Sequence, residues 1–212
     1  MADDDDDLLA PINELPPCCA PGTGGLRLQI ISLLMSDACQ DMKFRVGGVY
    51  FNGFLYRCVA NALREPGHKL HIQVVSSLPG GRDADYENGR IRVKFPILDN
   101  GTDLVYKCGT LIHECTHACI DAQPGLQVWR SVNEIAGYFA SFLWRRGQGY
   151  PMPDSGENNF VKTLCDLAVD ARKANVRGNV FKLPDSAVDY LKRIIITGYQ
   201  LPRDFLEVGK GF

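Results

Sequence analysis

Two long segments with helical periodicity follow each other in the second half of the sequence, and they constrain the fold most strongly. The first is TDLVYKCGTLIHECTHACIDA, residues 102–122, and the second is LQVWRSVNEIAGYFASFLWRRGQG, residues 126–149. Apolar residues recur in both at the spacing of an amphipathic helix. Gln-Pro-Gly separates the two patterns, and such a break is typical of a tight connection. The sequence therefore predicts two neighbouring helices joined by a short loop.

Around this pair the pattern predicts an α+β fold, with a small and mostly antiparallel sheet among about six helices. Apolar and charged residues alternate at residues 89–98, which indicates a strand, and residues 68–75 predict a second one. Pro96 suits the end of an edge strand, because a missing N–H would break a central ladder. The remaining helices are expected at residues 26–42, 51–67, 155–175 and 184–199.

The chain divides into a tail and one predicted domain. Residues 1–25 contain the acidic run Asp3–Asp7 followed by a segment rich in proline and glycine, a composition that is typical of a flexible tail. Residues 26–212 are long enough to bury a sizeable core, and 45% of the whole chain is hydrophobic. We therefore expect one folded domain over residues 26–212.

Charge and hydropathy exclude several classes of partner. A net charge of -2 gives no general attraction to nucleic acid or to an anionic membrane, so neither is expected. The first residues lack the basic and apolar regions of a signal peptide, and no apolar run reaches the roughly 18 residues of a membrane-spanning helix. We expect a cytoplasmic product that would need a leaderless export route to act outside a cell. The oligomeric state stays open.

The eight cysteines are expected to be reduced thiols rather than a disulfide framework, because no secretory leader is recognised. Cys18 and Cys19 are adjacent in the tail and have no matching pair at zinc-finger spacing. The other six lie among apolar residues, where cysteine behaves as a small hydrophobe; they are Cys39, Cys58, Cys108, Cys115, Cys119 and Cys165.

The segment HECTH, residues 113–117, contains the candidate metal-binding and catalytic residues. Residues i and i+4 share one face of a helix, so His113 and His117 can present two imidazoles to one metal ion, and zinc accepts such ligands. Glu114 lies beside that face, within reach of a water that the metal activates. The pattern thus predicts zinc, with Glu114 as the general base for attack on a carbonyl.

A catalytic zinc normally takes a third protein ligand, and two candidates follow HECTH. Asp121 is on the same helix, but three ligands over eight helical residues span roughly 12 Å, too far for one ion. We therefore expect Asp121 to orient His117 or a neighbour. Glu134 lies on the next helix among apolar residues, where a carboxylate is costly unless it is paired or bound to metal. Glu134 is the predicted third ligand, and Tyr138, four residues on, could donate to a developing oxyanion.

HECTH followed by NEIAGYFA on a second helix resembles the gluzincin branch of the zincin metallopeptidases, over roughly residues 89–148. It is also similar to compact bacterial zincin-like domains found in effectors and toxins. The resemblance implies a zincin-like fold that hydrolyses peptide bonds, with zinc on His113, His117 and Glu134. It further implies that the strand at residues 89–98 binds an extended peptide or protein substrate along a sheet edge.

Other interpretations stay open beside this one. Cys115 and Cys119 are four residues apart and could bind a soft metal, although apolar packing explains them better. His68 and His71 are left out of the site, because histidines near a strand are commonly solvated or bonded to backbone. The domain could also be an inactive zincin-like module used for recognition or regulation, or a helical interaction domain without metal.

Overall fold

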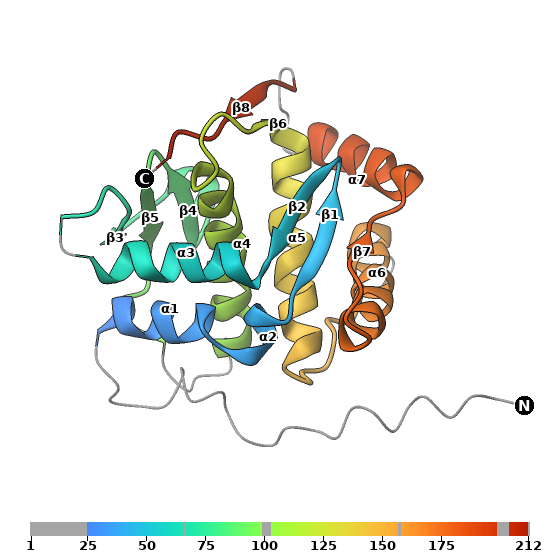
Figure 1. Ribbon diagram of the computed structural model, residues 1–212, viewed down its shortest axis with the longest axis horizontal. Coiled ribbons are helices and arrows are strands. Elements are labelled where there is room, and N and C mark those ends of the chain that lie inside the picture. Colours follow the sequence, from blue (N-terminus) through green and yellow to red (C-terminus); the bar gives the residue numbers. More distant parts are fainter. Residues whose placement is uncertain (1–24, 66, 99–102, 157, 199–203, 212) are drawn as a thin grey trace, which may run out of the picture.

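A computed structural model describes residues 25–65, 67–98, 103–156, 158–198 and 204–211, and within them the chain is an α+β protein (Figure 1). The helices are α1 (Leu26–Leu34), α2 (Asp37–Gln40), α3 (Gly53–Arg64), α4 (Leu104–Asp121), α5 (Arg130–Gly147), α6 (Asn159–Val176) and α7 (Asp185–Gly198), with a short 3-10 helix at Pro79–Gly81. The strands are β1 (Lys43–Val46), β2 (Val49–Asn52), β3 (His71–Val74), β4 (Ala84–Glu87), β5 (Arg90–Val93), β6 (Gln127–Trp129), β7 (Phe181–Lys182) and β8 (Leu206–Val208).

The strands form three small sheets rather than the one small sheet that the sequence pattern predicted. The first has the order β2-β1-β7, with β1 antiparallel to β2 and parallel to β7. The second has the order β3-β5-β4, with β5 parallel to β3 and antiparallel to β4. The third pairs β6 with β8 in antiparallel register. Two of the three sheets are therefore mixed, not antiparallel.

Helices α4 and α5 lie side by side at the centre of the structure, as the two helical patterns predicted (Figure 1). The β1–β2 hairpin packs against α5, where the Phe44 ring stacks on Phe51 and meets Phe139 edge-on. Helix α3 covers α4, and a buried hydrogen bond of 2.9 Å joins the hydroxyl groups of Tyr56 and Thr116. The central pair is thus held from both sides.

The β1–β2 hairpin differs from the sequence prediction, which has no strand before residue 68. Its four apolar residues alternate with polar ones and all face the core: Phe44, Val46, Val49 and Phe51. Gly47 and Gly48, both with positive φ, form the two-residue turn, and such a turn is a strong hairpin signal. The single helix expected at residues 26–42 is instead two helices: α1 ends at Leu34 and α2 begins at Asp37.

Strand β5 is the central strand of its sheet, so the prediction that residues 89–98 form an exposed edge is wrong. The partner β4, residues ADYE, has too short an alternating pattern to be recognised and was not predicted. Pro96 lies beyond the end of β5 and interrupts no ladder. The edge on the α4 side of this sheet belongs to β4, which contacts α4.

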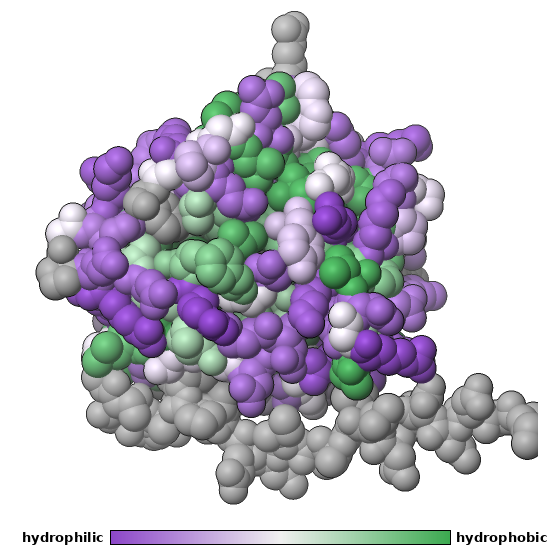
Figure 2. All heavy atoms as spheres, in the orientation of Figure 1, coloured by the Kyte–Doolittle hydropathy of each residue, from purple (hydrophilic) through white to green (hydrophobic). Residues whose placement is uncertain are grey.

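Most cysteines of the described residues are buried as free thiols, in agreement with the sequence analysis; Cys58 and Cys165 are partly exposed. Cys18, Cys19 and the predicted tail at residues 1–25 lie outside the described residues, apart from Gly25. No helix in the described part of the chain has the length and apolarity to cross a membrane. On the face seen in Figure 2, hydrophilic side chains form most of the rim and hydrophobic ones gather nearer the middle.

Candidate metal centre

His113 and His117 project from one face of α4 toward α5, and their rings meet edge-on with centroids 4.7 Å apart. His117 is buried, and the side chain of His113 is 11% exposed. Both line a cavity of about 670 Å³, a size typical of ligand-binding pockets. Potential ligand atoms of His113, Glu114 and His117 lie within 4.8 Å of one another, so this group could hold a metal ion.

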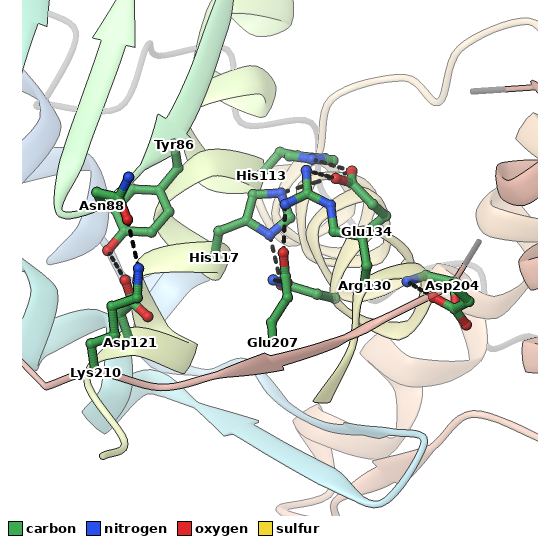
Figure 3. A network of polar contacts seen from close by, with 12 residues as sticks. Tyr86, Asn88, His113, His117, Asp121, Arg130, Glu134, Asp204, Glu207 and Lys210 are labelled. Carbon is green, nitrogen blue, oxygen red and sulfur yellow. Dashed lines mark hydrogen bonds and ion pairs between the residues drawn. The ribbon is translucent and has the colours of Figure 1, made fainter. Parts of the chain in front are cut away.

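Glu134 on α5 approaches the same two imidazoles. Its Oε2 atom lies 3.3 Å from His113 Nε2 and 3.8 Å from His117 Nε2. Tetrahedral zinc with bonds of about 2.0–2.1 Å would separate its ligand atoms by roughly 3.3–3.4 Å. The distance from Glu134 Oε2 to His113 Nε2 matches this value, and the distance to His117 Nε2 is roughly 0.4–0.5 Å longer. The other oxygen of Glu134, Oε1, forms an ion pair with Arg130, one helical turn earlier (Figure 3).

Gly137 allows the two helices to approach at this point. A Cβ atom built on Gly137 would lie 2.9 Å from Nδ1 and 3.0 Å from Cδ2 and Cε1 of His113. The His113 ring thus occupies the space that any other residue at position 137 would fill. Gly109 faces α5 less tightly, since a Cβ there would lie 3.8 Å from the Ser141 side chain. Gly137 carries no signal in the sequence pattern that predicts this role.

His117 is oriented by Asn133 and not by Asp121. Its Nδ1 atom lies 2.6 Å from Asn133 Oδ1. Asp121 instead accepts a hydrogen bond of 2.6 Å from the Tyr86 hydroxyl, so of the two expected partners it bonds to a neighbour that lines the cavity and not to His117 (Figure 3). Asp121 is the last residue of α4, one helical turn beyond His117, and its side chain bonds to Tyr86 on β4.

Glu207 on β8 contacts both residues that hold predicted metal ligands, Arg130 beside Glu134 and Asn133 beside His117. Its Oε1 atom pairs with Arg130 NH1 at 2.7 Å, and its Oε2 atom accepts from the amide of Asn133. Arg130 lies four residues before Glu134, a spacing at which helical side chains meet, so the sequence could have suggested this pair. Asn133 directly precedes Glu134, but this position does not by itself indicate a bond to His117. Glu207 follows a segment outside the described residues and carries no local signal, so sequence reasoning could not find it.

The two glutamates of the centre are in different electrostatic environments. Glu114 is 8% exposed, and burial raises the pKa of its carboxyl to about 7, opposed by the nearby His117. Burial would also raise the pKa of Glu134, but His117, His113 and Arg130 together hold that pKa well below its ordinary value. Glu134 is therefore held as a carboxylate by the cations and imidazoles around it.

Tyr138 packs edge-on against His113, with ring centroids 4.5 Å apart, and lines the cavity. Strand β4 forms another wall, since all four of its residues line the same cavity. Asp85 on this strand accepts two hydrogen bonds from Arg92, at 2.7 and 2.6 Å. The cavity thus extends from the histidines to the edge strand of this sheet.

The other two histidines, and Cys115 and Cys119 on α4, are not part of this centre. Nδ1 of His68 accepts from the backbone N–H of Leu70, and Nδ1 of His71 lies 3.0 Å from the Lys69 carbonyl. Cys115 and Cys119 are fully buried, and burial raises the pKa of both thiols. Neither pair belongs to the candidate metal group found among the described residues.

Comparisons of the chain with protein-family models, with curated proteins and with solved structures found no match. The assignment of a function therefore depends on the geometry of the centre.

Proposed function

We propose that this protein is a zinc-dependent metallopeptidase of the gluzincin type with a zincin-like fold. The observation that carries the proposal is the convergence of His113 Nε2, His117 Nε2 and Glu134 Oε2 at the wall of one cavity, within 3.8 Å of the shared carboxylate oxygen. A purely structural helix pair has no need to bury two imidazoles against a carboxylate beside an open cavity.

The donor set supports zinc. Two imidazoles and one carboxylate are the ligands of one recurrent catalytic zinc class, which keeps its fourth position open. The hydrogen bond at His117 Nδ1 leaves its Nε2 atom free to face the ion. When bound, zinc would polarise a substrate carbonyl and lower the pKa of a water molecule.

Glu114 would act as the general base in this proposal. It adjoins His113 on α4, lines the cavity, and has no hydrogen-bond or ion-pair partner among those found for the described residues. Its carboxylate can therefore receive the proton of an attacking water and return it to the leaving amine. Tyr138, on the α5 side of His113, would donate its hydroxyl proton to the carbonyl oxygen as negative charge develops there.

An extended substrate would bind along β4 rather than β5. Lys94 N donates to Asp83 O beside this strand, and hydrogen-bonded pairs alternate along an antiparallel ladder. Asp85 therefore turns its backbone groups toward β5, whereas Ala84 and Tyr86 turn theirs to the outer side of this edge strand. Main-chain hydrogen bonds at that edge would hold a peptide across the histidines without demanding one sequence.

The proposal is tested by zinc content and peptide cleavage on the same protein samples. Elemental analysis should give one zinc per chain in the wild type, and much less in His117→Ala and in Glu134→Ala. The wild type and Glu114→Gln are then incubated with a mixed peptide library, and new termini are identified by mass spectrometry. Zinc without new termini, alike in both proteins, would favour a metal-binding module over an enzyme. A wild type that binds no zinc would contradict the proposal entirely.

A further inference from the structure

Residues 204–211, here called the strap, cross the first turn of α5 and the end of α4. Asp204 accepts hydrogen bonds from the backbone N–H and the hydroxyl of Ser131, at 3.0 and 2.6 Å. Strand β8 then pairs with β6, and Gly211 N donates to the Asp121 carbonyl at 2.7 Å. Lys210 reaches Asn88, beyond β4 (Figure 3). The strap is therefore anchored on both sides of the metal centre.

Gly209 shows how closely the strap is seated. A Cβ atom built there would lie 2.2 Å from the Gln123 carbonyl oxygen and 2.5 Å from that of Ile120. Backbone bonds fix the same position, since Gly209 N donates to Leu126 O at 2.8 Å and Gly209 O accepts from Gly125 N at 2.9 Å. These contacts fix where the side chain of Glu207 enters.

Glu207 determines which way the Asn133 amide points. A carboxylate only accepts hydrogen bonds, so the Asn133 NH₂ group faces Glu207 and its Oδ1 atom faces His117. Oδ1 in turn only accepts, so His117 carries its proton on Nδ1. The tautomer with a free lone pair on Nε2, the atom that faces Glu134, thus follows from the charge at position 207.

Glu207 also acts on the second ligand, through Arg130. One nitrogen of the guanidinium, NH1, pairs with Glu207, and the other, NH2, pairs with Glu134 Oε1. The side chains of Arg130 and Glu207 are 24% and 21% exposed, so they are partly shielded from water. Because Arg130 holds the Oε1 atom of Glu134, the Oε2 atom of the same carboxylate is directed at both imidazoles.

We propose that Glu207 is a positioning residue of the metal centre, through which the strap sets the affinity for zinc. The inference rests on the proposed zinc site. Residues that orient metal ligands typically contribute about 10- to 100-fold to metal affinity. Glu207→Gln keeps the shape of the side chain but replaces one acceptor by a donor. It therefore cannot accept from Arg130 and Asn133 at the same time, and zinc affinity should fall about 10- to 100-fold.

A double variant separates positioning from a general structural effect. In the double variant Asn133→Asp with Glu207→Gln, the carboxylate at position 133 accepts hydrogen bonds from His117 Nδ1 and from the amide NH₂ group at position 207. The amide oxygen at position 207 then accepts from Arg130. Every bond of the network is restored with its acceptors exchanged, so zinc affinity should recover most of the loss. Lys210→Met is the matched control, because it removes a polar contact of the strap on the far side, at Asn88. It should bind zinc like the wild type.

Zinc affinity is measured by competition with a chromophoric chelator, and Co²⁺ absorption spectra report the ligand geometry. Wild-type affinity in Glu207→Gln, or a double variant as weak as the single one, would overturn the positioning role and leave the zinc site standing. A wild type without zinc would remove the proposed function and this inference together. Thermal melting of the metal-free proteins identifies a variant that merely fails to fold. If Glu207→Gln fails to fold, the zinc affinity of the double variant decides whether Glu207 positions the ligands.

Discussion

The Oε2 atom of Glu134 lies 3.3 Å from the Nε2 atom of His113, across the interface between α5 and α4. This separation is the edge length expected between two ligands of one tetrahedral zinc ion. It arises because Gly137 leaves room for the imidazole against α5 and because Arg130 holds the other oxygen of Glu134.

Zinc should stabilise the fold through His117. At free zinc of about 100 times the Kd, binding to the folded state alone contributes about 2.7 kcal/mol to the free energy of unfolding. Urea unfolding with zinc and with a chelator measures the difference. His117→Ala should lose most of this stabilisation. The variant keeps all eight cysteines, so any zinc bound by thiols of the unfolded chain affects both proteins equally. Equal stabilisation of both proteins would place the zinc elsewhere.

Glu114→Gln should retain zinc and lose turnover by about 10²- to 10⁴-fold, the usual contribution of a general base. The amide keeps the size of the side chain but cannot accept the proton. Initial rates on a peptide cleaved by the wild type give the ratio. Glu65→Gln, at the end of α3 and away from the cavity lining, is the control and should cleave normally. A Glu114→Gln protein with wild-type rates would exclude this residue as the base.

Gly137→Ala should weaken zinc binding, because the added methyl group would lie 2.9 Å from His113 Nδ1 and must displace the ring. Gly109→Ala is its counterpart on α4, where the methyl group meets Ser141 at an ordinary 3.8 Å. Replacing glycine by alanine inside a helix favours the helix by up to about 1 kcal/mol. Gly109→Ala should thus keep its zinc affinity and unfold at a slightly higher temperature. Equal zinc affinity in the two variants would show that the close approach at Gly137 is unimportant.

Tyr138→Phe should lower kcat by about 10²- to 10³-fold, the usual effect of removing one oxyanion donor. Zinc content should not change, since the phenylalanine ring keeps the edge-on packing against His113. Steady-state kinetics with zinc analysis separates the two effects. Loss of zinc together with activity would assign Tyr138 a packing role instead.

Acid should weaken the anchoring of the strap at Asp204. Burial raises the pKa of this carboxyl, but Lys192 and Ser131 outweigh it and hold the pKa below its ordinary value of 3.8. A group with a lowered pKa in the folded state stabilises the fold above its unfolded value, and loses this contribution as the pH falls through the folded value. Wild type should therefore be more stable than Asp204→Asn at pH 7, and the difference should disappear well below pH 3.8. A difference that does not change with pH would contradict the ion pair with Lys192.

The sheet beside the centre shows where sequence reasoning failed. The alternation in residues 89–98 identified the strand β5 correctly, but alternation does not reveal a strand's neighbours. Its apolar residues Ile91 and Val93 are completely buried, as suits a central strand. The edge strand β4 has only four residues, two of them acidic, and such a short polar segment gives little periodic signal.

The sequence by itself determined the neighbouring helices α4 and α5 and the grouping of His113, Glu114 and His117, because HECTH and the periodicity around Glu134 are local patterns within single helices. The spacing of four residues between His113 and His117 already aligns them on one face of α4. Tertiary structure alone decided that Asn133, and not Asp121, orients His117, and that β4 forms the cavity wall. It also brought Glu207 to Arg130. Those contacts join segments far apart in the chain, and their geometry depends on how the whole core packs.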